Sequence, residues 1–193
     1  MHTDRDIQEI ACQQVLLKDS SVFSVQWSIL PLRITVGLTT RRLLERYLTH
    51  IRRATLSAIR PAQSPGGIEF RLLGSRLSLI SFLPPEEADG VLILHICGGL
   101  LVQSRNCHRG ELSFSLQPTP AGIKACLQLS DYYPLILGSS TPSPLRRRLY
   151  RLTQAAIHRL VTVRFLMRIH RELTGNVTPV RVLNVNLCQG EPL

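Results

Sequence analysis

Apolar residues recur at three- and four-residue steps through a long segment that runs from Ser143 to Gly175. At about 100° per residue they fall on one narrow stripe, with polar residues on the opposite side, as in an amphipathic helix. The stripe consists of Leu145, Leu149, Leu152, Ala156, Leu160, Val163 and Met167. Ser143 suits the cap position and Gly175 the position just past the end. The pattern predicts one long helix over residues 144–174.

In the second half of this helix the apolar pattern broadens. Phe165, Leu166 and Ile169 lie away from the main stripe. Three interpretations remain open. The extra apolar surface is covered by a strand over residues 180–187, or it lines a cavity, or it forms a dimer contact.

A period of two precedes the helix and predicts half-buried strands. Phe23, Val25, Trp27 and Ile29 alternate with polar residues, which places Trp27 in the core. Further strands are expected over 68–72 and 77–82, joined by a tight turn at Gly74-Ser75, and over 91–104, 112–116 and 123–129. Gly98-Gly99 interrupts the longest of these, where a glycine pair indicates a bulge or a close approach to a ligand.

Two shorter helices complete the prediction. One lies within residues 1–20, capped by Thr3 and Asp6, with Ile7, Ile10, Ala11 and Val15 on one side. The other spans residues 40–60 and stops at Pro61. We therefore predict a single domain over residues 1–193 of the α+β class. An antiparallel sheet built from strands within 22–137 packs against the helix 144–174, and residues 177–193 form a tail or an extra strand.

This order of elements resembles the helix-grip fold of START-like proteins, the SRPBCC or polyketide-cyclase-like superfamily. The resemblance runs from Gly98-Gly99 through Gly110-Glu111-Leu112-Ser113-Phe114 to Asp131-Tyr132-Tyr133-Pro134 and into the long helix, and covers most of residues 23–174. The chain departs from the family in having one longer helix where two small ones are usual, and in the strand after Gly175.

The resemblance implies a hydrophobic or amphipathic small molecule held between sheet and helix. Catalytic residues are not shared across the superfamily, so no catalytic residue and no cofactor is assigned, and enzymatic activity stays open. The residues expected to line such a site, which equally fit a closed core, are Phe114, Leu127, Tyr133, Val163 and Met167.

The formal net charge of +10 points to a second function. Nearly all of it is arginine, since Lys18 and Lys124 are the only lysines. Such a chain attracts nucleic acid, an acidic protein or an anionic membrane surface, unless the bias is merely compositional. The first turns of the two longer helices carry arginines whose positive charge opposes the helix dipole. This indicates either an anion bound at the helix starts or surface arginines whose charge is screened by salt and solvent. They are Arg41, Arg42, Arg146, Arg147 and Arg148.

Histidine and cysteine give a weaker signal. His95 and Cys97 share one face of a strand, and Cys107-His108 follow on a turn. Their spacing lacks the close cysteine pair of structural zinc sites, so no metal site is assigned. A thiol catalytic set of Cys97 or Cys107 with a histidine and Asp131 has no local support.

The chain shows no secretory signal between Thr3 and Lys18, and its five cysteines are scattered, so we expect reduced thiols in the cytoplasm. The apolar run 91–102 is broken by His95 and Gly98-Gly99 and is too short to cross a bilayer as a helix.

Overall fold

The structure is a computed structural model that describes residues 7–32, 35, 37–138 and 142–193. Within these residues eleven strands form one sheet in the order β10-β1-β2-β9-β8-β7-β5-β4-β3, with β11 beside β1 and β6 beside β7. The strands are β1 Gln8–Leu16, β2 Val22–Leu30, β3 Ile59–Ser64, β4 Gly67–Leu72, β5 Ser78–Phe82, β6 Glu86–Ala88, β7 Val91–Gly98, β8 Glu111–Thr119, β9 Gly122–Tyr132, β10 Val180–Asn184 and β11 Glu191–Pro192. Neighbouring strands are antiparallel except β1 and β10, which are parallel.

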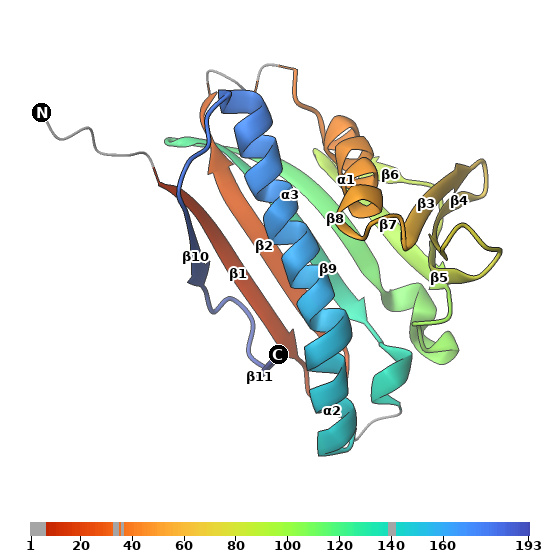
Figure 1. Cartoon of the computed structure of the whole chain (residues 1–193). Coiled ribbons are helices and arrows are strands. Elements are labelled where there is room, and N and C mark those ends of the chain that lie inside the picture. The colour runs from red at the N-terminus through yellow and green to blue at the C-terminus, as the bar shows by residue number, and fades with distance from the viewer. Residues whose placement is uncertain (1–6, 33–34, 36, 139–141) are drawn as a thin grey trace, which may run out of the picture.

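The helices are α1 Thr40–Ala54, α2 Pro144–Tyr150 and α3 Ala156–Thr174. A π-helical turn, Arg151–Ala155, joins α2 to α3, so the two form one long helix. Figure 1 shows α1 and this long helix side by side on one face of the sheet. The predicted α+β class, an antiparallel sheet against a long C-terminal helix, is confirmed.

The ends of the long helix match the sequence prediction. The Ser143 hydroxyl accepts a hydrogen bond from the Arg146 amide at 3.4 Å, which caps the first turn. Gly175 follows α3 in the left-handed conformation, with φ of 72°. The hairpin of β4 and β5 also lies where it was predicted.

The predicted helix within residues 1–20 is wrong over the described residues, where the chain forms strand β1. Ile10 and Cys12 face the helices, while Ala11 and Val15 on the opposite face are also buried. A strand that is buried on both faces loses its alternating pattern, so its apolar spacing imitates a helix. The predicted cap residues Thr3 and Asp6 lie outside the described residues.

The predicted helix over residues 40–60 is too long. The chain leaves α1 at Thr55, and Leu56 and Ser57 adopt positive φ values of 50° and 63° that reverse its direction. Pro61 does not stop the helix but lies in β3, at the edge of the sheet. Proline is tolerated there because an edge strand leaves one row of backbone groups unpaired.

Three aromatic rings join the sheet to both helices. Tyr47 of α1 contacts Phe114 of β8 at a centroid distance of 5.4 Å and Phe165 of α3 at 5.1 Å. All three side chains are buried, and burial raises the pKa of Tyr47 to about 12. The space between sheet and helices is therefore filled with packed side chains at this level.

Strand β2 places its polar residues under the long helix. Ser24, Gln26 and Ser28 are fully buried, whereas Ile29 is exposed and Trp27 is half-buried on the face without helices. The prediction of Trp27 as a core residue is wrong. The buried groups are largely paired: Gln8 donates to Ser28 at 3.2 Å, and Gln26 donates to Ser24 at 2.8 Å. These hydrogen bonds offset much of the cost of burying polar side chains.

Candidate functional site

The outward face of the long helix carries a row of solvent-exposed aliphatic side chains. Leu145 is 75% exposed and Leu152 is 64% exposed. We call this row the leucine stripe, and it consists of Leu145, Leu149, Leu152, Ile157, Leu160 and Met167. Exposed apolar side chains that recur along one face of a helix mark an interaction site more often than scattered single residues do.

The stripe is nearly the one that the periodicity identified, but it faces solvent. The side of the long helix that packs on the sheet is instead the one away from the stripe. It carries Phe165, Leu166 and Ile169, which are at most 1% exposed. Part of the side expected to be polar is also inward, since Thr162 is fully buried. Of the three open interpretations, only the cavity applies, and only in part. The packed core of the sheet covers most of the broad apolar half, with Phe165 against α1, while Phe165 and Ile169 also line a groove between α1 and α3.

The π-helical turn contributes to this arrangement. A π turn holds more residues than an α turn, so the five residues Arg151–Ala155 rotate α3 relative to α2 about the common axis. With this offset, Leu145 and Leu149 of α2 and Leu160 and Met167 of α3 all remain on the outward side. No local pattern in the sequence indicated the π turn.

Exposed arginines accompany the leucine stripe. Arg148, Arg151, Arg164 and Arg171 form no ion pair with any described residue. Arg147 differs, because its guanidinium pairs with Glu191 at 2.5 Å and donates to the Pro142 carbonyl. The outward face of the long helix therefore combines aliphatic side chains with free positive charge.

The two predicted arginine clusters do not meet at one site. The first half of α1 lies against the end of α3, where Arg46 pairs with Glu172 at 3.3 Å. Arg41 and Arg42 are thus at one end of the helix layer, and Arg146–Arg148 at the other. Their helix starts are capped by Thr39 and Ser143, each of which accepts one backbone N–H. The two helix starts therefore do not form a shared anion site, and the positive charge is instead spread over the outer faces of both helices.

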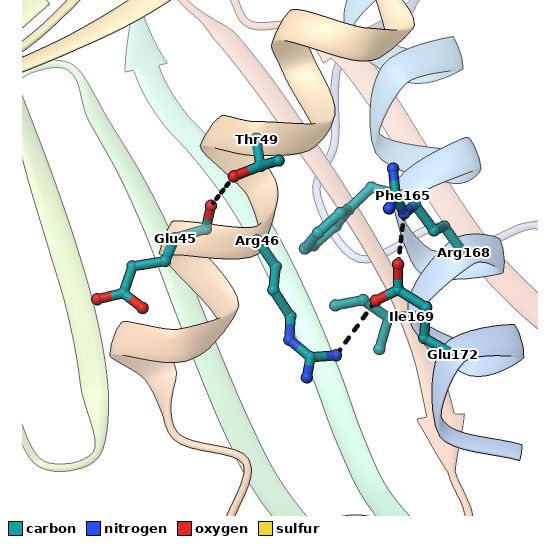
Figure 2. Close-up of a pocket in the computed structure, with 7 residues that line it drawn as sticks. All are labelled: Glu45, Arg46, Thr49, Phe165, Arg168, Ile169 and Glu172. Atoms are coloured by element: carbon teal, nitrogen blue, oxygen red, sulfur yellow. Dashed lines mark hydrogen bonds and ion pairs between the residues drawn. The ribbon is translucent and has the colours of Figure 1, made fainter.

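Figure 2 shows the shallow groove between α1 and α3, which has a volume of about 210 Å³. Phe165 and Ile169 form its apolar floor. Glu172 accepts hydrogen bonds from Arg46 of α1 and from Arg168 of α3, the latter at 2.6 Å. Because these charged groups are already paired with one another, we assign this groove a role in holding the helices together.

The five predicted ligand-lining residues are not brought together. Phe114 and Leu127 are paired neighbours on β8 and β9 and are buried under the helices. Tyr133 lies beyond the end of β9, where its hydroxyl donates to Asp19 at 2.6 Å and Arg109 stacks on its ring. Val163 packs against the core from α3, whereas Met167 is on the outward stripe.

Two histidines bury ring nitrogens at the packed side of the long helix, and the sequence patterns did not single them out. His50 of α1 hydrogen-bonds the Val161 carbonyl at 3.1 Å. Its Nδ1 and the Nε2 of His158 are buried without a hydrogen-bond partner among the described residues. Burial lowers the pKa of His50, and it lowers that of His158 to about 4. Both rings are therefore neutral at pH 7.

The histidine and cysteine residues considered for metal binding or thiol chemistry do not form a common site. His95 lies between Glu86 and Glu111, each 3.4 Å from one ring nitrogen. Cys107 is buried in a 3₁₀ turn, where its thiol donates to the Ser104 carbonyl. Burial raises the pKa of the Cys97 thiol, which disfavours the reactive thiolate. No cluster of three metal-ligating side chains exists within the part of the chain that the structure describes.

The comparisons with known proteins give a distant fold resemblance. No protein-family model and no curated protein matches the chain. Among solved structures, the solution NMR structure of CalU16 from Micromonospora echinospora matches with a TM-score of 0.39 and 11% identity, covering 91% of this chain and 79% of CalU16. The crystal structure of CalU16 matches with a TM-score of 0.36 and 14% identity, covering 88% and 95% of the two chains. Among the described residues, no helix has the length and hydropathy to span a membrane.

Proposed function

We propose that this protein is a binding protein that docks on a polyanionic partner through the outer face of its helix layer. The observation that carries the proposal is the set of exposed arginines on α2 and α3 without acidic partners among the described residues, beside the leucine stripe. Arginine binds phosphate and carboxylate groups through paired hydrogen bonds, and its charge is independent of pH in the physiological range.

The distribution of charge over the helix layer supports this function. On α1 the outer positions add Arg41, Arg42, Arg52 and Arg53, all exposed. The acidic residue Glu172 is already occupied by Arg46 and Arg168. A surface of one predominant sign raises the local concentration of oppositely charged partners and accelerates their association.

The proposal predicts salt-sensitive binding that depends on the position of the arginines. With a short DNA duplex as a charge-only probe, the double variant Arg148→Ala/Arg151→Ala should bind more weakly. The slope of log affinity against log salt should flatten by about 0.9 for each phosphate that the variant no longer neutralises. Fluorescence anisotropy over a series of salt concentrations measures both quantities.

The matched control removes the same charge elsewhere. Arg76 lies in the turn between β4 and β5 and Arg105 in a 3₁₀ turn, and both are exposed. Arg76→Ala/Arg105→Ala should leave the slope nearly unchanged. Equal effects of the two double variants, or no binding of the duplex at low salt, would refute the proposal.

Binding of a hydrophobic or amphipathic small molecule is a second candidate. It is favoured by an open hollow of about 580 Å³ beside β1 and β2, lined by Trp27, Ile29, Leu183 and His170 among others. Its position differs from the cavity predicted between sheet and helix, which aromatic side chains fill at the level of Phe114.

A small molecule that occupies this hollow should co-purify with the protein. Native mass spectrometry of protein prepared without detergent is expected to show an additional non-covalent mass that Trp27→Ala reduces. Observation of the bare chain mass alone, together with Trp27 fluorescence that does not change on solvent extraction, removes this candidate.

A further inference from the structure

We infer that the polyanionic partner is the surface of an anionic phospholipid bilayer, into which the leucine stripe inserts. This inference rests on the proposed function and adds the class of partner. Two kinds of side chain share the outward face of the long helix. One is the set of arginines without ion pairs, such as Arg148, Arg151 and Arg164, and the other is the exposed aliphatic side chains between them.

The stripe has the dimensions and position of an interfacial helix. From Leu145 to Met167 it extends over about 33 Å at 1.5 Å per residue. Phe165, Leu166 and Ile169 are buried in the core and fix the helix to the sheet, whereas the side chains of the stripe are exposed to solvent. Helices of this kind lie in the plane of the membrane, with aliphatic side chains among the acyl chains and arginines at the phosphates.

The chemistry of the stripe favours lipid over nucleic acid. Nucleic-acid surfaces offer phosphates to arginine, but single-strand binding also uses aromatic rings on which bases stack. The leucine stripe contains aliphatic side chains and one thioether, with no aromatic ring. Aliphatic side chains gain free energy by leaving water for hydrocarbon, which a bilayer supplies along the whole stripe.

With the helix in the plane of the membrane, its arginines complement the negative charge of the lipid headgroups. A long aliphatic stem allows arginine to lie along apolar surface while its guanidinium remains at the level of the phosphates. The helix is already held by the sheet, so docking does not require a disordered segment to fold. The positive charge then selects anionic over zwitterionic membranes.

The test uses the whole protein and sedimented vesicles of two compositions. Vesicles of phosphatidylcholine with phosphatidylserine should bind the protein, and vesicles of phosphatidylcholine alone should bind it much more weakly. The variant Leu152→Gln/Leu160→Gln should reduce partitioning onto the anionic vesicles about tenfold or more, since it removes two inserted side chains. Its binding to a DNA duplex should be unchanged because every arginine is retained.

A matched control uses exposed leucines outside the helix layer. Leu73 is 67% exposed and Leu100 is 48% exposed, and Leu73→Gln/Leu100→Gln should bind vesicles as the unaltered protein does. A tryptophan introduced as Leu152→Trp should shift its fluorescence to the blue on anionic vesicles, and Leu73→Trp should not. Thermal unfolding of every variant establishes that each is folded.

The outcomes separate this inference from the proposed function. If Arg148→Ala/Arg151→Ala weakens vesicle and duplex binding equally while Leu152→Gln/Leu160→Gln weakens neither, the proposed function stands and insertion is refuted. If neither vesicles nor duplex bind at low salt, both are refuted. If sedimentation velocity shows a dimer that the leucine variant dissociates, and anionic vesicles do not bind, the stripe's occupant is a second copy of this chain and the inference is wrong.

Discussion

Replacement of Phe165 with alanine is expected to lower the free energy of unfolding by about 3–5 kcal/mol. Its ring is 1% exposed and contacts Tyr47 at 5.1 Å, so alanine would leave a cavity between both helices and the sheet. Removal of the aromatic contact adds to the decrease in buried area. Urea denaturation followed by circular dichroism measures the change.

Leu152→Ala is the control on the opposite face of the same helix. Because Leu152 is 64% exposed, its truncation should change the free energy of unfolding by less than about 0.5 kcal/mol. The reverse order, with Leu152→Ala more destabilising than Phe165→Ala, would show that the helix packs on the sheet through its leucine stripe and would refute the orientation described above.

Acidification from pH 7 to pH 4.5 is expected to destabilise the fold through His158 and His50. Burial lowers the pKa of both rings below the ordinary value of 6.5, that of His158 to about 4. The unfolded chain therefore binds protons between these values while the folded chain does not. The contribution of these rings to the free energy of unfolding is fully present above pH 6.5 and is lost as the pH falls toward 4. For His158 the loss between pH 6.5 and pH 4 amounts to roughly 3 kcal/mol.

Urea denaturation at a series of pH values tests this expectation. In His158→Gln the slope of unfolding free energy against pH between 6.5 and 4.5 should become shallower, because a group that titrates only in the unfolded chain has been removed. An unchanged slope in His158→Gln would show that the ring is accessible to protons in the folded state.

The fold class was predictable from the sequence because the signals involved are local. Alternation along β8 and β9, the serine cap at Ser143 and the glycine at Gly175 each act within a few residues. The order of these elements was enough to predict a sheet against a long helix.

The sequence could not show which face of each element is buried. On β2 the polar Ser24 and Gln26 lie under the long helix, while Trp27 lies on the other face. Periodicity identifies two faces of a strand or helix, but the choice between them depends on its neighbours. Hydrogen bonds to distant residues, such as that from Gln8 to the Leu166 carbonyl, make the polar interior stable and leave no local signal.

The same limit applies to the candidate site. The arginine bias was evident from composition, but the leucine stripe was interpreted as a buried face because amphipathic helices usually bury their apolar side. Only the packing of Phe165 and Leu166 against the sheet shows that the stripe is free to bind. The candidate site is therefore recognised by a difference: the apolar stripe that the sequence pattern identifies is not the side of the helix that packs on the sheet.

Methyl NMR of the protein with anionic nanodiscs that carry a paramagnetic lipid tests the central claim most directly. Docking through the outward face of the long helix predicts strong broadening of the methyl signals of Leu149, Leu152 and Leu160. The buried methyl groups of Leu127 and Leu166 should stay sharp. Broadening confined to the helix-free face of the sheet, as at Ile29, or no broadening at any methyl group, would contradict the account.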